Sequence, residues 1–132
     1  MNEKVSLWAK KAIEDFKTAE HEMNLPESET VTSSVCFHSQ QFVEKMLKAF
    51  LTSRGTDFGK TYNIEYLLKL CSKTDKNFEK VDLPDLTIYA VEVRYPDEFY
   101  TPSFREAKDC FEAISRFRKF IFEKLGIRQG NL

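Results

Sequence analysis

Hydrophobic and polar positions from Val5 to Ala19 follow the pattern of an amphipathic helix. Apolar side chains recur at steps of three and four residues, with charged side chains between them. We predict that the helix ends near Leu25, because Pro26 follows. The apolar set is Val5, Trp8, Ala9, Ala12, Ile13, Phe16 and Ala19, and the charged set between them is Lys10, Lys11, Glu14, Asp15 and Lys17.

A second amphipathic pattern predicts a long helix between a cap at Ser28 or Thr30 and a stop at Gly55. About 25 residues at roughly 1.5 Å each give a length on the order of 37 Å. Its apolar arc is broad, which indicates a central helix with neighbours on several sides. That arc contains Val35, Phe42, Val43, Met46, Leu47, Ala49, Phe50 and Leu51, and the narrow polar stripe contains Ser34, His38, Gln41, Lys45, Lys48 and Thr52.

Three further helical patterns follow in the second half of the chain. The second of them must stop near Arg94, because the residue before Pro96 is pushed out of helical geometry. No strand pattern competes with these helices. We therefore predict one all-α domain over residues 1–132, an antiparallel up-and-down bundle of four to five helices. The expected boundaries are Ile64 to Cys71, Pro84 to Arg94, and a cap at Ser103 with a stop at Gly126.

Composition supports a folded domain and argues against nucleic-acid binding through overall positive charge. Hydrophobic residues make up 42% of the 132 residues and charged residues 31%, which is the balance of a globular protein and not of a disordered one. Lys and Arg number 20 and Asp and Glu 21, so the net charge is −1. Without a global positive field, any binding of nucleic acid must depend on a local patch.

The cysteines and the N-terminus indicate a cytoplasmic protein. Cys36, Cys71 and Cys110 are odd in number and lack the C-x-x-C spacing of zinc or redox sites, so we expect a reducing compartment and neither a metal nor a cofactor. The first residues lack the apolar run of a signal peptide, and charges interrupt every long apolar stretch. We expect no contact with a membrane.

One polar pair is out of place on the second helix. Gln40 and Glu44 lie one turn apart, within or at the edge of the apolar arc. A carboxylate in such a position is costly unless another group satisfies it, so Glu44 needs a partner. Arg94, at the end of the expected fourth helix, is the best candidate in the sequence. A structural ion pair tying the two helices is the simplest interpretation.

The same residues also allow a functional interpretation. A guanidinium at Arg94, with His38 or Lys45 nearby, would make a cationic corner that binds a phosphate, and Tyr95 could stack on a base. In the structural interpretation, His38 is merely a polar surface residue. The residues alone leave both interpretations open.

Four segments in order resemble the HEPN family: FHSQQFVEKMLKAFL (37–51), KTYNIEYLLKL (60–70), VRYPDEFY (93–100) and SFREAKD (103–109). The resemblance covers roughly residues 5 to 125, and its most specific part is the run Gln40, Gln41, Glu44, Lys45, Lys48 and Ala49. It implies an antiparallel helical bundle that commonly dimerises, with the end of the fourth helix at the dimer cleft.

Many relatives are toxins that cleave RNA, or partners of minimal nucleotidyltransferases in toxin–antitoxin pairs. The RNA-cleaving members carry an Arg, then four to six residues, then a His at that cleft, and Arg94 matches the first position. Phe99, Tyr100 and Thr101 occupy the positions where the histidine should fall, and none of them acts as a general acid or base near neutral pH as His does. The resemblance therefore favours binding over catalysis.

The leading hypothesis is a homodimeric, HEPN-like protein that binds nucleotide or RNA beside a nucleotidyltransferase partner in a toxin–antitoxin-type pair. Two alternatives stay open. One is a metal-independent ribonuclease that uses Arg94 and His38, and the other is a non-catalytic dimeric interaction scaffold. The expected ligand-binding residues are Arg94, Tyr95, His38, Gln41, Glu44 and Lys45.

Overall fold

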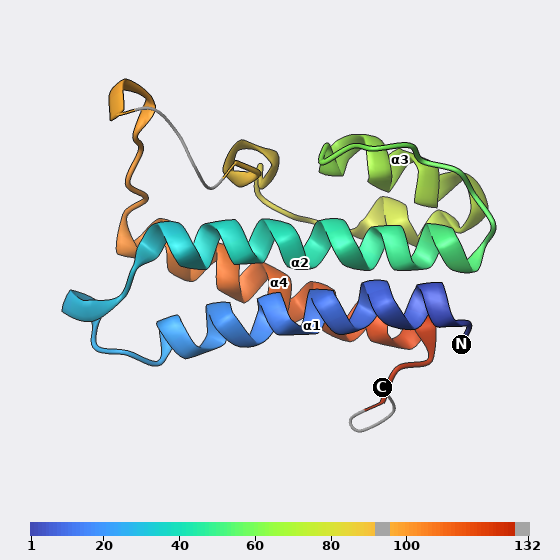
Figure 1. Cartoon of the computed structure of the whole chain (residues 1–132), viewed down its shortest axis with the longest axis horizontal. Helices are drawn as coiled ribbons and strands as arrows, with labels where there is room; N and C mark the ends of the chain where they lie inside the picture. Colours follow the sequence, from blue (N-terminus) through green and yellow to red (C-terminus); the bar gives the residue numbers. More distant parts are fainter. Residues whose placement is uncertain (92–95, 129–132) are drawn as a thin grey trace.

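The computed structural model describes residues 1–91 and 96–128, and these residues are helical or irregular, with no strand (Figure 1). An all-α fold is thereby confirmed, with four α-helices in the described part. None of these helices combines the length and apolar character that crossing a bilayer requires. In chain order, with η for a short 3-10 helix, the elements are α1 (Glu3–Met23), η1 (Glu27–Glu29), α2 (Thr32–Ser53), α3 (Ile64–Thr74), η2 (Lys76–Lys80), η3 (Thr87–Tyr89), η4 (Pro96–Glu98) and α4 (Phe104–Leu125).

Helix α2 is the centre of the molecule, as its broad apolar arc predicts. It packs against α1, α3, α4 and η3. Figure 1 shows α1 running antiparallel to α2, while α4 runs in the same direction as α2, and the chain returns between them through α3, η2 and η3. The apolar side chains of α2 that are fully buried are Val35, Cys36, Phe42, Val43, Met46, Leu47, Ala49, Phe50 and Leu51.

Aromatic rings join the long helices in the core. Phe42 of α2 lies between Phe16 of α1 and Phe117 of α4, with ring centroids 5.2 and 6.2 Å away. Further along α2, Phe50 packs against Phe78 of η2 at 4.5 Å. Such tilted ring pairs add to the free energy that area burial supplies, so these contacts fix how the three long helices sit together.

The last helix has the boundaries that its sequence predicts. The Ser103 Oγ accepts a hydrogen bond from the backbone N–H of Glu106 at 3.0 Å, which is an N-cap. At the other end Gly126 takes a left-handed conformation with φ +67°. Helix α3 is capped in the same way, because the Asn63 side chain accepts from the N–H of Tyr66.

The predicted start of the second helix is wrong by a few residues. Neither Ser28 nor Thr30 caps α2, which begins at Thr32. The Thr30 hydroxyl instead donates to backbone carbonyls at the end of α1, including that of Glu22 at 3.3 Å. The Glu22 carboxylate reaches across and accepts from the N–H of Val31 at 2.9 Å, so an acid of α1 supplies the cap.

The helix predicted from Pro84 to Arg94 is also wrong in its described part, where only the short turn η3 forms. The Thr87 hydroxyl accepts from the backbone N–H of Ile64 at 3.1 Å and donates to the Glu65 carboxylate at 2.8 Å. These bonds to another element compete with regular helix formation. The expected fourth helix is therefore replaced by an irregular segment attached to α3.

Candidate functional site

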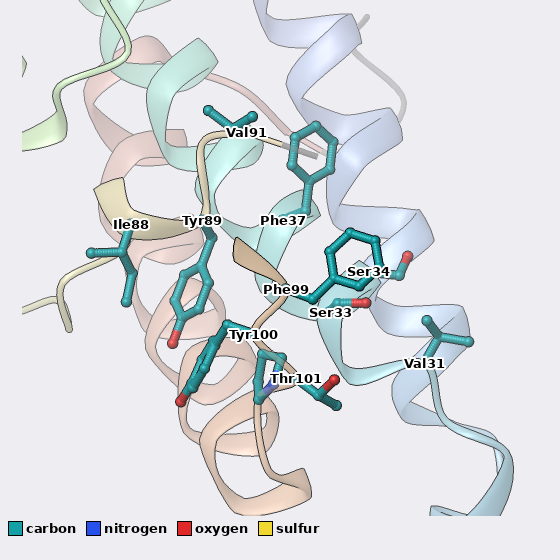
Figure 2. Close-up of a pocket in the computed structure, with 11 residues that line it drawn as sticks. Val31, Ser33, Ser34, Phe37, Ile88, Tyr89, Val91, Phe99, Tyr100 and Thr101 are labelled. Carbon is teal, nitrogen blue, oxygen red and sulfur yellow. The ribbon is translucent and has the colours of Figure 1, made fainter. Parts of the chain in front are cut away.

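A groove with a volume of about 540 Å³ lies where the start of α2 faces the irregular segment before α4 (Figure 2). One wall is the first turns of α2, and the other comes from the residues around η3 and the approach to α4. The bond from the Thr32 hydroxyl to the Pro102 carbonyl, 2.7 Å long, ties the two walls together. The lining residues are Val31, Ser33, Ser34, Phe37, Ile88, Tyr89, Val91, Phe99, Tyr100, Thr101 and Pro102.

Aromatic rings dominate the groove. Phe37, Tyr89, Phe99 and Tyr100 all line it, and Figure 2 shows their rings gathered around the same space. Phe99 is 68% exposed and Tyr100 57% exposed, which is unusual for large aromatic side chains. An exposed ring offers a π-face that any flat aromatic ligand can stack on.

A carboxylate orders the two tyrosines of the groove. The hydroxyls of Tyr89 and Tyr100 both donate to Glu106 in the first turn of α4. Burial and then this hydrogen bond raise the pKa of Tyr89, while for Tyr100 the hydrogen bond to Glu106 is the main reason that the pKa is raised. Both hydroxyls therefore stay protonated at neutral pH, and both rings are held in place.

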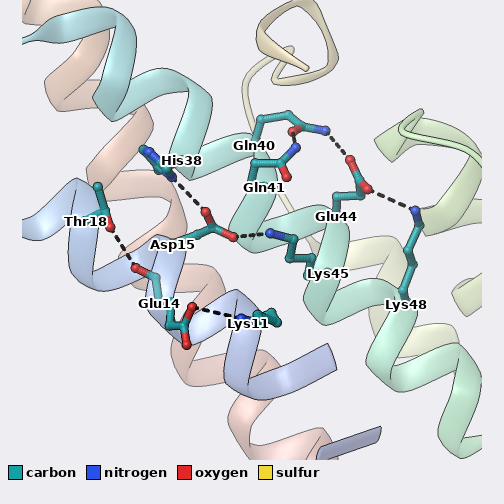
Figure 3. A network of polar contacts seen from close by, with 10 residues as sticks. All are labelled: Lys11, Glu14, Asp15, Thr18, His38, Gln40, Gln41, Glu44, Lys45 and Lys48. Atoms are coloured by element: carbon teal, nitrogen blue, oxygen red, sulfur yellow. Dashed lines mark hydrogen bonds and ion pairs between the residues drawn. The ribbon is translucent and has the colours of Figure 1, made fainter. Parts of the chain in front are cut away.

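A second polar cluster lies between α1 and α2 and is centred on Asp15 (Figure 3). His38 Nδ1 lies 2.7 Å from Asp15 Oδ1, and Lys45 Nζ lies 2.7 Å from Asp15 Oδ2. An ionised carboxylate only accepts hydrogen bonds, so Nδ1 carries the proton and Nε2 is left as the second nitrogen of the ring. Asp15 is only 7% exposed, and its two oxygens hold the side chains of His38 and Lys45 in place.

A third cluster runs along α2 itself. Gln41 Nε2 donates to Gln40 Oε1 at 2.7 Å, and Gln40 Nε2 donates to Glu44 Oε1 at 2.9 Å. The other oxygen of Glu44 accepts from Lys48 Nζ at 2.9 Å (Figure 3). The prediction that Glu44 needs a partner is confirmed, and its partners here are Gln40 and Lys48 of the same helix.

The predicted binding residues fall into three groups. His38 and Lys45 meet on Asp15, whereas Gln41 and Glu44 belong to the chain of contacts along α2. Arg94 and Tyr95 lie outside the described residues, so the pairing of Arg94 with Glu44 and the stacking of Tyr95 on a base stay predictions. Lys48 was assigned to the polar stripe but is buried, so that assignment is corrected.

Sequence reasoning missed Asp15 as a site residue, because it was counted among the charged positions of the first helix. A signal was present: Asp15 lies three residues after Ala12 and four before Ala19, at the spacing of the apolar face. The aromatic groove was also missed, since its two walls, drawn from residues 31–37 and 88–102, are far apart in the chain and no local pattern connects them.

Among the described residues, no group of three or more His, Cys, Asp or Glu side chains is arranged to hold a metal ion. No curated protein and no solved structure matches the chain significantly. The family described as HEPN domain matches residues 5–125, which is nearly the whole chain. The helical architecture agrees with that match, and the protein therefore belongs to the HEPN domain family.

Proposed function

We propose that this protein binds a nucleotide or single-stranded RNA, with one base held in the aromatic groove. Membership of the HEPN domain family favours a function related to nucleotides or RNA. The observation that carries the proposal is the set of exposed rings, Phe99 and Tyr100 above all, around a groove of about 540 Å³. Stacking of a base on an aromatic ring contributes about 1 to 3 kcal/mol.

The groove offers hydrogen-bonding groups beside the rings. Hydroxyls of Ser33, Ser34 and Thr101 lie along its lining. In sequence, Arg94 falls between Val91 and Phe99, which both line the groove. We assign the phosphate of the ligand to Arg94, because a guanidinium binds phosphate oxygens bidentately.

Titration of fluorescently labelled oligouridylate into Phe99→Ala, with polarisation as the readout, tests this assignment. Loss of one stacking ring should weaken binding by roughly 5- to 150-fold, which corresponds to about 1 to 3 kcal/mol. Leu7→Ala is the matched control, because Leu7 is a similarly exposed apolar residue on α1. Equal affinities of the two variants would show that the base does not bind in the aromatic groove.

Arg94→Ala tests the phosphate contact separately. It should weaken binding of uridine monophosphate more than binding of uridine, since only the former carries the phosphate. Arg128→Ala, at an exposed position after α4, controls for the loss of one positive charge. The same loss for nucleoside and nucleotide would contradict the role assigned to Arg94.

A second candidate function, metal-independent cleavage of RNA, is favoured by the contact between Asp15 and His38. A carboxylate that holds Nδ1–H fixes the tautomer of the imidazole and lets Nε2 act as a general base. Cleavage of RNA in the presence of a chelator should then vanish in His38→Ala and fall strongly in Asp15→Asn. Lys45→Met, which leaves the imidazole contact intact, should retain cleavage. If the unmodified protein does not cleave RNA, this second function is excluded and only the binding proposal remains.

We further propose a homodimer that acts beside a minimal nucleotidyltransferase in a toxin–antitoxin-type pair. The resemblance of the segment around Arg94, Tyr95 and Pro96 to partnered relatives supports this. Light scattering of the purified chain measures its oligomeric state. If the neighbouring gene encodes a nucleotidyltransferase, the two products should co-purify when they are expressed together. A monomer, or a neighbour of another class, would count against the pair.

A further inference from the structure

The outer face of α3 carries an aromatic and basic stripe, which we define as Tyr62, Tyr66, Lys69 and Lys73. Tyr66, Lys69 and Lys73 follow at steps of three and four residues, so they share one face of α3, and Tyr62 lies just before the N-cap, Asn63. All four residues are exposed, with Tyr62 at 55% and Tyr66 at 46%. The buried residues of α3, such as Leu67 and Cys71, lie on the opposite face.

The described part of the chain provides no hydrogen-bond or ion-pair partner for the polar side-chain groups of the stripe. Within residues 1–91 and 96–128, neither tyrosine hydroxyl makes a hydrogen bond, and neither lysine forms an ion pair. The acid of the first turn, Glu65, is occupied by the Thr87 hydroxyl at 2.8 Å. The rings and the ammonium groups are therefore available to a ligand that is both flat and anionic.

The start of the stripe is held close to two elements that also form the aromatic groove, η3 and α2. Thr87 of η3 accepts from the backbone N–H of Ile64, and the next two residues, Ile88 and Tyr89, line the groove. The carbonyl of Tyr62 accepts from Gln40 of α2 at 3.3 Å, which holds the start of the stripe against the central helix. Figure 1 shows α3 and η3 on the same side of α2, opposite α1.

Resting on the proposed function, we propose that the stripe extends the groove into a track for single-stranded RNA. Bases stack on Tyr62 and Tyr66, and Lys69 and Lys73 bind the following phosphates. Rings beside cations complement a strand whose bases are unstacked, whereas a duplex hides those faces. From Tyr66 to Lys73 the helix rises about 10 Å, so the track adds contacts that a mononucleotide cannot reach.

The experiment compares affinities for uridine monophosphate and for oligouridylates of increasing length by fluorescence polarisation. Tyr66→Ala should leave mononucleotide binding unchanged and weaken binding of the long oligomers roughly 5- to 150-fold. Tyr66→Phe, which keeps the ring, should restore most of that affinity. Thermal melting of both variants checks that the fold is intact.

The lysines are tested through salt dependence. Lys69→Ala combined with Lys73→Ala should reduce the slope of log affinity against log salt by about 1.4, since each phosphate contact on a single strand contributes about 0.7. Lys10→Ala combined with Lys17→Ala removes the same charge from exposed positions of α1 and should leave the slope unchanged.

The outcomes separate the track from the groove. Long RNA bound by the α3 variants as tightly as by the unmodified protein overturns the track, and a role of this face in binding an acidic protein would then replace it. If those variants fail on long RNA while Phe99→Ala binds normally, the groove proposal fails and the track stands. Wild-type affinity that does not rise with oligomer length also overturns the track.

Discussion

Lys48 shows how a charged residue is accommodated inside this small core. Its ammonium lies 2.9 Å from the Glu44 carboxylate and 5.4 and 5.7 Å from the ring centroids of Trp8 and Phe58. The residue is only 7% exposed. The ion pair and the two aromatic faces offset the cost of removing the charge from water.

Replacement of Lys48 by Met should destabilise the protein strongly. The substitution leaves the Glu44 carboxylate buried without its cation, which costs about 3 to 5 kcal/mol. The free energy of unfolding, measured in urea, reports this loss. The double variant Lys48→Met with Glu44→Gln carries no charge at these two positions and should recover much of the stability. Equal losses in the single and double variants would mean that the pair does not act as a unit.

Asp15 and Glu44 show what a sequence can reveal about buried charges. Glu44 is recognisable because it lies within or at the edge of the broad apolar arc of α2. Asp15 has charged neighbours in sequence, Glu14 among them, and only its partners on α2 explain why it is buried. Partners on another helix depend on how the helices pack, and periodicity along one helix does not contain that information.

The C-terminus of α4 depends on one residue with a positive φ. Gly126 has φ +67°, and the backbone N–H of Ile127 donates to the Phe122 carbonyl at 2.8 Å, the long bond of a Schellman motif. Gly126→Ala should lower the free energy of unfolding by about 1 to 2 kcal/mol, because a Cβ is strained in this conformation. Gly126→Asn should cost less, and identical losses would argue against backbone strain.

An ion pair joins η2 to α4 and gives a pH-dependent contribution to stability. Lys124 Nζ lies 2.7 Å from Asp75 Oδ2, and the other oxygen of Asp75 accepts from the N–H of Asn77. The hydrogen bond from Lys124, and next the one from Asn77, lower the pKa of Asp75 below its ordinary 3.8. The ion pair therefore stabilises the folded protein fully above the ordinary pKa of 3.8. This stabilisation is lost as the pH falls through the lowered pKa of Asp75 in the folded protein.

Thermal melting from about pH 5 to about pH 2 checks this contribution. Asp75→Asn cannot titrate, so its melting temperature should fall less steeply over this range than that of the unmodified protein. At neutral pH the variant should be less stable, since Lys124 loses its charged partner and keeps its contacts with Asn77 and the Phe120 ring. Parallel curves for the two proteins would exclude Asp75 as a source of the acid dependence.

Element boundaries were predictable where the capping group is local. Ser103 and Gly126 bound α4 with their own side chain and backbone. The start of α2 was not predictable, because Glu22 of another helix supplies the cap. The prediction for the segment after Pro84 failed for a similar reason, since the Thr87 side chain bonds to α3 and its backbone closes only the single turn η3. Contacts between elements decide these cases, and sequence pattern alone does not show them.

At the scale of the whole molecule, the pattern of α2 determines the bundle. The groove forms because the segment before α4 comes back to the start of α2. The broad apolar arc of α2 predicts a central helix, and the structure packs α1, α3, α4 and η3 against it. The groove instead requires residues near Ser34 to meet residues near Tyr100, across an irregular segment. Such a juxtaposition is set by tertiary packing, so the sequence predicts the bundle but not this site.

The three cysteines provide a test of whether the whole bundle is closed. All three are buried, and they lie on α2, α3 and α4. Burial raises the pKa of Cys71 to about 12, and a hydrogen bond with Cys110 together with burial raises that of Cys36. The same bond lowers the pKa of Cys110, so what protects all three thiols alike is burial. A disulfide reagent such as dithionitrobenzoate should therefore react slowly with the native protein at mildly alkaline pH and rapidly with all three thiols in denaturant. A thiol of the native protein that reacted as fast as free glutathione would show that its part of the core opens readily.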